Sequence, residues 1–351
     1  MNVLHVAQSF DLCGRSRMIH ELCAGLAPHG IHGQVAVLGG SVGYRPPDLE
    51  CVARGRGEGF SPVAVLWLAG IIRRQRAQIL HTHGRGAAVY GALAASLARP
   101  RKWIHTVHRA DGDRISSRPA VRRFVTGRMT RIVAVSNAAR REFEQQHAGA
   151  SEKAQVISNG IHVERFQGNK ESSFSGVTVG AVANLSPDKD HETLLRGFAE
   201  FLKRCSGARL VVVGDGPCAG DVRSMAQRLG ISGAVEFTGF RTDVPALLRT
   251  FDVFAHAAHT EGLGLAILEA MAARVPVVAS DVGGIPEIVR NAINGRLFPA
   301  GNAGALCQAL AEAVDQPDAT AAMAEQGFHD VVDRFSVESM CAAYERLYRS
   351  P

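Results

Sequence analysis

Short apolar runs alternate with longer segments of helical spacing along the first half of the chain. Residues 2–7 are predicted to form a strand, and residues 18–29 follow with apolar side chains three and four positions apart, the spacing of an amphipathic helix. The alternation continues with a helix at 63–76 and strands at 35–38, 79–81, 103–108 and 131–135. These strands are short and continuously apolar, as strands covered on both faces are.

A polar stretch without periodicity, residues 167–175, separates this half from a second one that repeats the pattern. Strands are predicted there at 178–182, 209–213, 235–238, 253–256 and 276–279. Helices alternate with them at 191–205, 220–229, 243–251, 265–273 and 285–291. Such alternation predicts two α/β domains, each with a parallel sheet and right-handed crossovers. Domains of this class bind ligands beyond the carboxyl ends of their strands, and two facing domains enclose a cleft.

Composition places the chain among globular proteins. Of its 351 residues, 46% are hydrophobic and 21% charged, which excludes disordered and fibrous classes. The seven cysteines form no C-x-x-C pair, as expected for reduced thiols rather than disulfides or a zinc site. The N-terminus lacks the basic region of a signal peptide, and the longest apolar run, residues 63–72, is shorter than the ~20 residues of a membrane span. We therefore expect a cytoplasmic protein that is not integral to a membrane.

Charge is divided unevenly between the two halves. Residues 1–170 contain 24 Lys and Arg against 11 Asp and Glu, a net charge of +13. Residues 171–351 contain 15 against 22, a net charge of −7. This asymmetry indicates two domains that meet different partners.

The densest candidate chemistry lies between Glu261 and Glu269, two carboxylates eight positions apart around Gly262 and Gly264. Glycines let backbone N–H groups approach a ligand closely, and the N-terminus of the helix that follows favours an anion. The segment therefore predicts a phosphate-binding loop flanked by two carboxylates that accept hydrogen bonds from hydroxyls, which suits a sugar nucleotide. The alternative is that Glu261 only complements the helix dipole and that Glu269 is a solvated helix residue.

This segment, with residues 276–284 after it, resembles the E-x7-E signature of the GT4 family of retaining glycosyltransferases. Other segments match motifs of that family in the same order along the chain. They are residues 156–161 (VISNGI for I-P-N-G-V), 182–189 (VANLSPDK for G-R-L-x-P-x-K-G), 211–217 (VVVGDGP for V-G-x-G-P) and 235–240 (VEFTGF for F-x-G). The resemblance covers nearly the whole chain. It implies the GT-B architecture, in which two Rossmann-like, doubly wound parallel-sheet domains face a cleft.

The resemblance also implies a domain plan and an activity. Residues 1–168 would bind the acceptor, residues 169–335 would bind the nucleotide sugar, and a helix at 336–351 would pack back on the first domain. The enzyme would move a hexose-type sugar from a nucleotide-diphosphate sugar to a hydroxyl of a glycan or glycolipid, such as a bacterial surface-polysaccharide or lipopolysaccharide intermediate. Retention of configuration is implied, and no metal or other cofactor is expected. Alternatives are a soluble small-molecule acceptor, an epimerase of the same fold and a catalytically impaired nucleotide-sugar-binding protein.

The resemblance assigns roles in the donor site. Glu261 would hold hydroxyls of the donor sugar, Glu269 the ribose and Lys189 the diphosphate, and Glu261 and Lys189 are catalytic candidates. Asn184 replaces the family's usual diphosphate arginine and carries no charge, so His191 and Arg241 become candidates for the missing cation. The other donor-binding candidates are Gly14, Gly214, Gly239, Phe240, Gly262, Leu263, Gly264 and Leu265.

In the first half, His108 ends a predicted strand and aligns with a histidine that family members place near the donor sugar. It is the third catalytic candidate. Gly14 and Arg15 stand where the family has a G-G-x-E-like loop, so they would serve the diphosphate or the acceptor unless Gly14 only turns the chain. His81 and His83 resemble the family's H-T-H. We expect them to be structural or to line the cleft, because the sequence shows no third metal ligand for them.

Arginines crowd residues 99–131, and interleaved apolar side chains make residues 119–130 a basic amphipathic helix. Such a helix lies on an anionic membrane surface or binds a phosphorylated acceptor, the alternative being a solvated face. The acceptor or membrane candidates are Arg15, Arg109, Arg118, Arg122 and Arg123. Nucleic acid is not expected as a partner, because aromatic residues for base stacking make up only 6% of the chain.

Two further motifs compete with this interpretation. Asp111 and Asp113 form a D-x-D, the metal–diphosphate motif of the other large glycosyltransferase fold, but they lie in the half opposite to the E-x7-E. Residues 214–220 nearly match a dinucleotide-binding glycine pattern, but they miss it by one residue and no acidic residue follows a later strand. We therefore expect neither a metal site nor a dehydrogenase.

Overall fold

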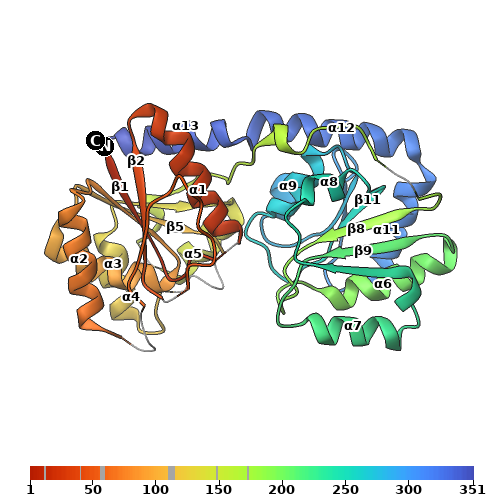
Figure 1. Ribbon diagram of the computed structural model, residues 1–351, viewed down its shortest axis with the longest axis horizontal. Coiled ribbons are helices and arrows are strands. Elements are labelled where there is room, and N and C mark those ends of the chain that lie inside the picture. The colour runs from red at the N-terminus through yellow and green to blue at the C-terminus, as the bar shows by residue number, and fades with distance from the viewer. Residues whose placement is uncertain (12, 40, 56–59, 110–114, 148, 172–173) are drawn as a thin grey trace. The chain divides into compact units, whose positions relative to one another are not determined.

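The computed structural model describes residues 1–351 apart from residues 12, 40, 56–59, 110–114, 148 and 172–173. The chain divides into an N-terminal unit, Met1–Gly160 with Val337–Pro351, and a C-terminal unit, Ile161–Ser336. Within each unit, helices cover both faces of a parallel sheet (Figure 1). The prediction of two Rossmann-like parallel-sheet domains is confirmed.

The N-terminal sheet has the strand order β3-β2-β1-β4-β5-β6-β7 over the described residues. Its strands are β1 (Asn2–Ala7), β2 (His32–Val37), β3 (Cys51–Ala53), β4 (Ile79–His83), β5 (Lys102–Val107), β6 (Arg131–Ala134) and β7 (Ala154–Val156). The strand order reverses between β1 and β4, so the connections after these two neighbours run to opposite sides. Doubly wound sheets bind their ligands at such a reversal.

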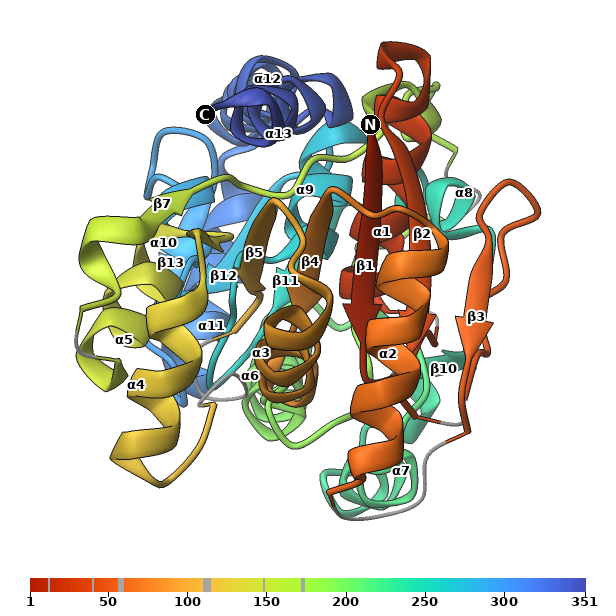
Figure 2. The same ribbon diagram turned by 90° about the vertical axis from the view of Figure 1, so that its left-hand side faces the viewer.

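Helices cover both faces of the N-terminal sheet. They are α1 (Gly14–Leu26), α2 (Pro62–Arg74), α3 (Arg85–Ala98), α4 (Pro119–Arg128), α5 (Asn137–Gln146) and α13 (Val337–Arg349). Helices α2, α3 and α4 lie side by side on one face (Figure 2). Helices α1 and α13 pack against each other on the opposite face, where Met18, Leu22, Met340 and Tyr344 belong to one apolar core.

The C-terminal sheet has the order β10-β9-β8-β11-β12-β13 over the described residues, and its order reverses between β8 and β11. Its strands are β8 (Thr178–Val182), β9 (Arg209–Val213), β10 (Val235–Gly239), β11 (Val253–His256), β12 (Val277–Ser280) and β13 (Arg296–Phe298). Its helices are α6 (His191–Arg204), α7 (Ala219–Arg228), α8 (Val244–Leu248), α9 (Leu265–Ala272), α10 (Ile285–Ile288), α11 (Ala303–Asp315) and α12 (Pro317–Arg334).

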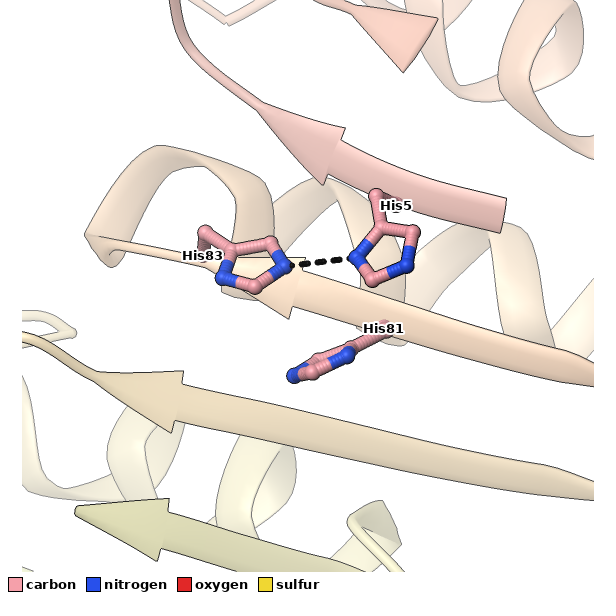
Figure 3. A group of neighbouring side chains, drawn as sticks. All are labelled: His5, His81 and His83. Atoms are coloured by element: carbon pink, nitrogen blue, oxygen red, sulfur yellow. Dashed lines mark hydrogen bonds between the residues drawn. The ribbon is translucent and has the colours of Figure 1, made fainter. Parts of the chain in front are cut away.

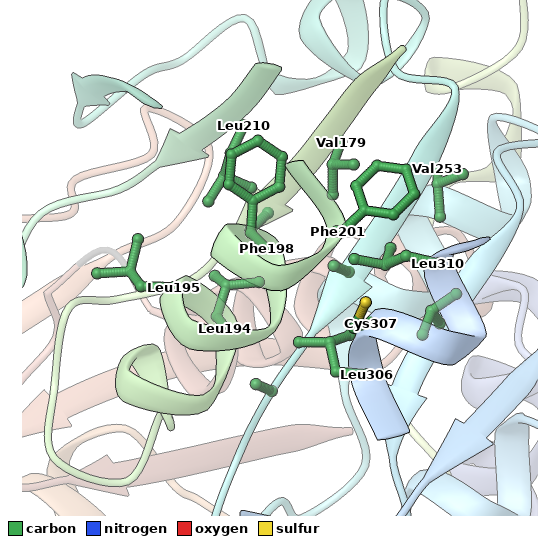
Figure 4. Packing of buried hydrophobic residues seen from close by; sticks show 14 of the residues in the cluster. Val179, Leu194, Leu195, Phe198, Phe201, Leu210, Val253, Leu306, Cys307 and Leu310 are labelled. Carbon is green, nitrogen blue, oxygen red and sulfur yellow. The ribbon is translucent and has the colours of Figure 1, made fainter. Parts of the chain in front are cut away.

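Helices α6 and α11 pack on each other and on this sheet to form the main core of the C-terminal unit (Figure 4). Phe198 and Phe201 of α6 meet Leu306 and Leu310 of α11 there. The two helices come closest at Gly197, where an added Cβ would lie 2.8 Å from the carbonyl oxygen of Ala303. This core fixes the position of α6, and therefore of the loop that connects β8 to it.

The division between the units falls at Gly160 and Ile161, earlier than the expected domain end at residue 168. Ile161 belongs to the C-terminal unit because its backbone N–H donates to the carbonyl oxygen of Phe335 at 2.9 Å. Val163 and Phe166, which follow, are buried. The polar stretch at 167–175 therefore lies inside this unit rather than at its edge.

Several elements escaped the sequence analysis. They are β3, β7 and β13, of three residues each, and helices α3, α5, α11 and α12. A three-residue strand is too short to show alternation. Helix α3 is rich in alanine and glycine and is held by packing against its neighbours rather than by a clear apolar stripe.

Tyr344→Ala should lower the free energy of unfolding of the N-terminal unit by about 3–5 kcal/mol, the usual cost of truncating a large buried aromatic side chain. Tyr344 is fully buried, and its hydroxyl lies 3.1 Å from Thr106 Oγ1. Both tryptophans, Trp67 and Trp103, lie in this unit, so their fluorescence in urea reports on it. Arg346→Ala, on the exposed side of α13, is the control and should cost less than ~0.5 kcal/mol. Equal effects of both variants would show that α13 does not stabilise the unit.

Candidate functional site

Two loops of the C-terminal unit bring opposite charges together where the strand order reverses. Lys189 lies in the loop after β8, and Glu261 lies in the loop after β11. These parallel strands are neighbours, so both loops leave the same edge of the sheet. Lys189 Nζ forms an ion pair with Glu261 Oε2, and the two side chains are only 14% and 16% exposed. The structure therefore places both catalytic candidates of this unit in direct contact.

Glu261 is fixed by several neighbours. Its Oε1 accepts a hydrogen bond from the Gly262 N–H at 3.1 Å, and its Oε2 lies 3.2 Å from His256 Nε2 at the end of β11. Its carbonyl oxygen accepts the Gly284 N–H at 3.0 Å, and a Cβ at Gly283 would lie 2.1 Å from that oxygen. This segment therefore requires a glycine at position 283.

The carboxyl of Glu261 is ionised in this setting. Burial by itself would raise its pKa, but the hydrogen bond from His256 and the charge of Lys189 outweigh burial and hold the pKa well below its usual range. Burial and the Lys189 charge lower the pKa of His256 in turn, so its imidazole is neutral. Because a carboxylate only accepts, the contact requires the hydrogen of His256 to be on Nε2.

The glycine loop leads from Glu261 into α9. Leu263 is buried, and Gly264 caps the helix with a φ of +100°, a left-handed conformation that favours glycine. Leu265 is the first residue of α9, and Glu269 lies within it with only 3% of its surface exposed. The alternative interpretation of Glu269 as a solvated helix residue is therefore wrong.

The remaining donor-site candidates lie at the ends of β9 and β10. The Gly214 N–H donates to the Gly239 carbonyl oxygen at 2.9 Å, which ties the two strand ends together. Gly214 has a φ of +136°, and a Cβ there would lie 1.9 Å from the carbonyl oxygen of Ala183. The ends of β8, β9 and β10 therefore meet closely. Phe240 follows with 58% of its surface exposed, unusual for a phenylalanine that only packs.

Asn184, in place of the family's arginine, is exposed in the loop after β8. Its carbonyl oxygen lies 3.2 Å from His191 Nε2. Burial lowers the pKa of His191, so His191 is neutral at physiological pH and does not supply the missing cation. Arg241 is exposed and paired with Asp243 at 2.6 Å. Lys189 is thus the cation that the structure places against Glu261.

The N-terminal unit gathers histidines at its own strand reversal. His5 of β1 is paired in register with His81 of β4, and His83 lies two residues further along β4 on the same face. His5 Nδ1 lies 3.0 Å from His83 Nε2 (Figure 3). His83 Nδ1 lies 3.1 Å from His108 Nε2, after β5. A chain of imidazole contacts therefore links His108, the third catalytic candidate, to the sheet interior.

His5, His81 and His83 also form a candidate metal group, with one ligand atom of each within 4.8 Å of the others. His5 is the third ligand that the sequence analysis did not find. However, His81 Nδ1 lies 2.6 Å from the Tyr348 hydroxyl, and its Nε2 lies 2.7 Å from Thr106 Oγ1. Both of its nitrogens are therefore engaged. We interpret the group as a hydrogen-bonded network that orients His108.

These histidines are neutral. Burial lowers the pKa of His5 to about 3 and holds that of His83 well below its usual range. The pKa of His108 is also lowered, mainly by burial and then by the charge of Arg15. Gly14 and Arg15 are the first residues of α1, so Gly14 begins a helix rather than lying in a loop. The structure thus brings Arg15 and His108 together, as candidates of one site.

The other arginine candidates belong to a different surface. Arg118 is the N-cap of α4, and Arg122 and Arg123 lie in its first turns. A guanidinium nitrogen of Arg122 donates to the carbonyl oxygens of Ser116 and Ser117 at 2.9 and 3.0 Å. Arg109 follows β5 and is half-buried. The D-x-D of residues 111–113 lies outside the described residues.

Comparison with known proteins identifies the family. Residues 14–165 match the family "Glycosyltransferase Family 4", and residues 166–330 match "Glycosyl transferases group 1". The chain belongs to glycosyltransferase family 4. Its fold is GT-B, and it superimposes on the crystal structure of Anabaena HepE in complex with UDP and glucose with a TM-score of 0.86, 21% identity and full coverage of both chains.

Two relatives indicate the range of this family. A GDP-mannose-dependent alpha-(1-6)-phosphatidylinositol monomannoside mannosyltransferase of Mycobacterium tuberculosis is 34% identical over 174 residues, which cover 47% of this chain and 45% of the relative. The N-acetyl-alpha-D-glucosaminyl L-malate synthase of Bacillus anthracis is 26% identical over 297 residues, which cover 80% of this chain and 77% of the relative. The match to the mannosyltransferase thus spans about half of that relative's length.

Within this GT4 chain, sequence reasoning found Lys189, Glu261 and His108 but missed two residues that touch them. His256 appeared only as the end of a predicted strand, and His5 only as a residue of the first strand. Their position at the carboxyl half of strands beside a reversal of strand order is the signal that could have found them. None of the helices in the described part of the chain is long and apolar enough to span a membrane.

The unfolding free energy of the N-terminal unit should fall steeply as the pH drops below about 6.5. The pKa values of His5 and of His105, which burial lowers to about 3, mean that the unfolded chain takes up protons that the folded unit refuses. Each such histidine removes about 1.4 kcal/mol per pH unit between the unfolded and folded pKa. Urea titrations by tryptophan fluorescence at pH 7.5, 6.5, 5.5 and 4.5 measure this slope.

His105→Gln should reduce the slope by about 1.4 kcal/mol per pH unit, one proton's worth. His329→Gln, which changes an exposed histidine of the C-terminal unit, is the matched control and should keep the wild-type slope. A wild-type free energy that stays flat between pH 6.5 and 4.5 would contradict the neutral network.

Proposed function

We propose that this GT4 chain is a retaining glycosyltransferase that moves a hexose-type sugar from a nucleotide-diphosphate sugar to a hydroxyl of a glycan acceptor. The observation that carries the proposal is the contact between Lys189 and Glu261 at the reversal of strand order. One loop presents a cation suited to a diphosphate, and the other presents a carboxylate suited to sugar hydroxyls. Buried Glu269, in the helix that follows, is assigned to the ribose.

The proposed mechanism relies on electrostatic stabilisation of the leaving diphosphate. As the bond from the anomeric carbon to the phosphate oxygen breaks, negative charge grows on that oxygen. Lys189 and the backbone N–H groups of residues 262–264 stabilise that charge. The same oxygen takes the proton of the acceptor hydroxyl, which attacks from the same face, so configuration is retained and no covalent enzyme intermediate forms. We propose that Lys189 makes a divalent metal unnecessary.

In this mechanism, the histidine network acts on the orientation of His108. Its contact with His83 leaves the ring one preferred position, and its lowered pKa keeps it neutral beside Arg15. A neutral imidazole can donate a hydrogen bond to a sugar hydroxyl without adding charge near the departing diphosphate. We assign His108 to the donor sugar on this basis, together with the family resemblance.

Lys189→Ala should lower kcat/KM for transfer by about 10²–10³-fold, the usual loss when one charge-stabilising donor is removed. Glu261→Ala should cause a loss of similar size, because the sugar loses its hydroxyl contact. Transfer is measured with UDP-, GDP-, ADP- and dTDP-sugars, with and without EDTA, and circular dichroism checks folding. Lys203→Ala, an exposed lysine on α6, is the control.

Near-normal turnover of either variant would contradict its assigned role. Stabilisation of the wild-type protein by none of these nucleotide sugars in a thermal-shift assay would favour the alternative, a binding protein impaired by Asn184. A donor at 100 times its Kd should add about 2.7 kcal/mol, which such an assay detects readily.

For the acceptor, we propose a lipid-linked or phosphorylated glycan at an anionic membrane, on the cytoplasmic side. The exposed apolar surface lies at α2 rather than on α4. Phe60, just before α2, and Val63 and Leu66 in its first turns are 61%, 61% and 64% exposed, and Arg73 and Arg74 end the same helix. Apolar side chains beside arginines match the boundary of an anionic bilayer. The mycobacterial relative is named for a lipid acceptor, whereas the Bacillus relative is named for L-malate, which keeps a soluble acceptor as the second candidate.

The protein should sediment with vesicles that contain anionic lipid at low salt, and 0.5 M salt should release it, because salt screens charges at a surface. Val63→Ser with Leu66→Ser should weaken this binding at least tenfold, since burying each side chain contributes roughly 1.5–3 kcal/mol. Leu97→Ser on α3, 45% exposed, is the matched control and should bind as the wild type does. No sedimentation even at low salt would remove the membrane proposal and favour the soluble acceptor.

A further inference from the structure

Lys189 and Glu261 neutralise each other in the free protein, although the proposed function gives each a different part of the donor. Lys189 Nζ contacts Glu261 Oε2, and both side chains are largely shielded from water. A diphosphate that approaches Lys189 must therefore compete with a carboxylate that already occupies it. Since a shielded ion pair is expensive to break when one partner is left alone, the fate of Glu261 after the exchange decides the outcome.

Glu261 does not lose all its partners when Lys189 leaves. His256 Nε2 lies 3.2 Å from the same oxygen, and the Gly262 N–H donates to the other oxygen at 3.1 Å. His256 is itself only 3% exposed, at the end of a buried strand, so its ring cannot swing away. Both contacts are neutral donors that stabilise a carboxylate without cancelling its charge.

We propose that the Lys189–Glu261 ion pair is the resting form of the donor site, which the diphosphate opens by drawing Lys189 away. His256 is then the positioning residue that holds Glu261 for the sugar hydroxyls. This inference rests on the proposed function, because it needs Lys189 to bind a diphosphate. It explains why one carboxylate oxygen receives two donors: one leaves with the ligand and the other stays.

The first test is binding of nucleoside diphosphates that lack a sugar. Glu261→Gln removes the competing charge but keeps the side-chain shape, so the full-length variant should bind the preferred one of UDP, GDP, ADP and dTDP about tenfold more tightly than wild type by isothermal titration calorimetry. The corresponding nucleotide sugar should gain much less, because this variant has lost the carboxylate that accepts the sugar hydroxyls. Glu325→Gln, which removes an exposed carboxylate paired with Arg274, is the control and should bind as wild type does.

The outcomes separate the two proposals. If wild type and Glu261→Gln bind none of these diphosphates, the proposed function fails. If wild type binds one of them and Glu261→Gln binds it no more tightly, the proposed function stands and the exchange of partners is overturned.

A second test addresses His256. His256→Leu should lower kcat for transfer at least tenfold while the Kd of the nucleoside diphosphate stays within twofold of wild type, because Lys189 is untouched. His256→Gln, whose amide N–H can still donate, should recover most of the loss. Equal defects in the two variants, or parallel changes in kcat and diphosphate affinity, would show that His256 only fills space. Circular dichroism melting curves confirm that both variants fold.

Discussion

The reversal of strand order in each parallel sheet is the constraint on which the candidate site depends. In the C-terminal sheet, β8 and β11 are neighbours, but the chain leaves them in opposite directions. No crossover helix covers the space directly beyond their ends, so two loops can place side chains there. Lys189 arrives from one loop and Glu261 from the other. The ion pair is thus a consequence of topology before it is one of charge.

The donor half of this site could be predicted from sequence because its signals are local. Glu261, Gly264 and Glu269 lie within nine residues, and their spacing already defines a loop that opens a helix. Lys189 came from the resemblance to a family motif. His256 could not be found in this way, since its value lies in a contact at 3.2 Å that depends on how the chain turns back after β11. A histidine at the end of a buried strand carries no mark of that turn.

The histidine network shows the same limit in the N-terminal unit. The H-x-H spacing places His81 and His83 on one face of a strand, which sequence periodicity establishes. The third histidine comes from β1, far earlier in the chain, and the register pairs this residue, His5, with His81. Only the order of strands in the sheet brings them together. The fold class was predictable from alternation alone, whereas three-residue strands such as β3 gave too little pattern to be seen.

The charge balance of the donor site gives Asn184 its meaning. In a site with an arginine at position 184, a lysine and an arginine would face one carboxylate, and the site would stay positive before any ligand arrives. Here His191 is neutral and Lys189 is already paired with Glu261, so the resting site has little excess charge. Attraction for a diphosphate must then come from freeing Lys189 and from backbone N–H groups at the start of α9. Asn184 therefore shifts the burden of diphosphate recognition from standing charge to the exchange of partners at Lys189.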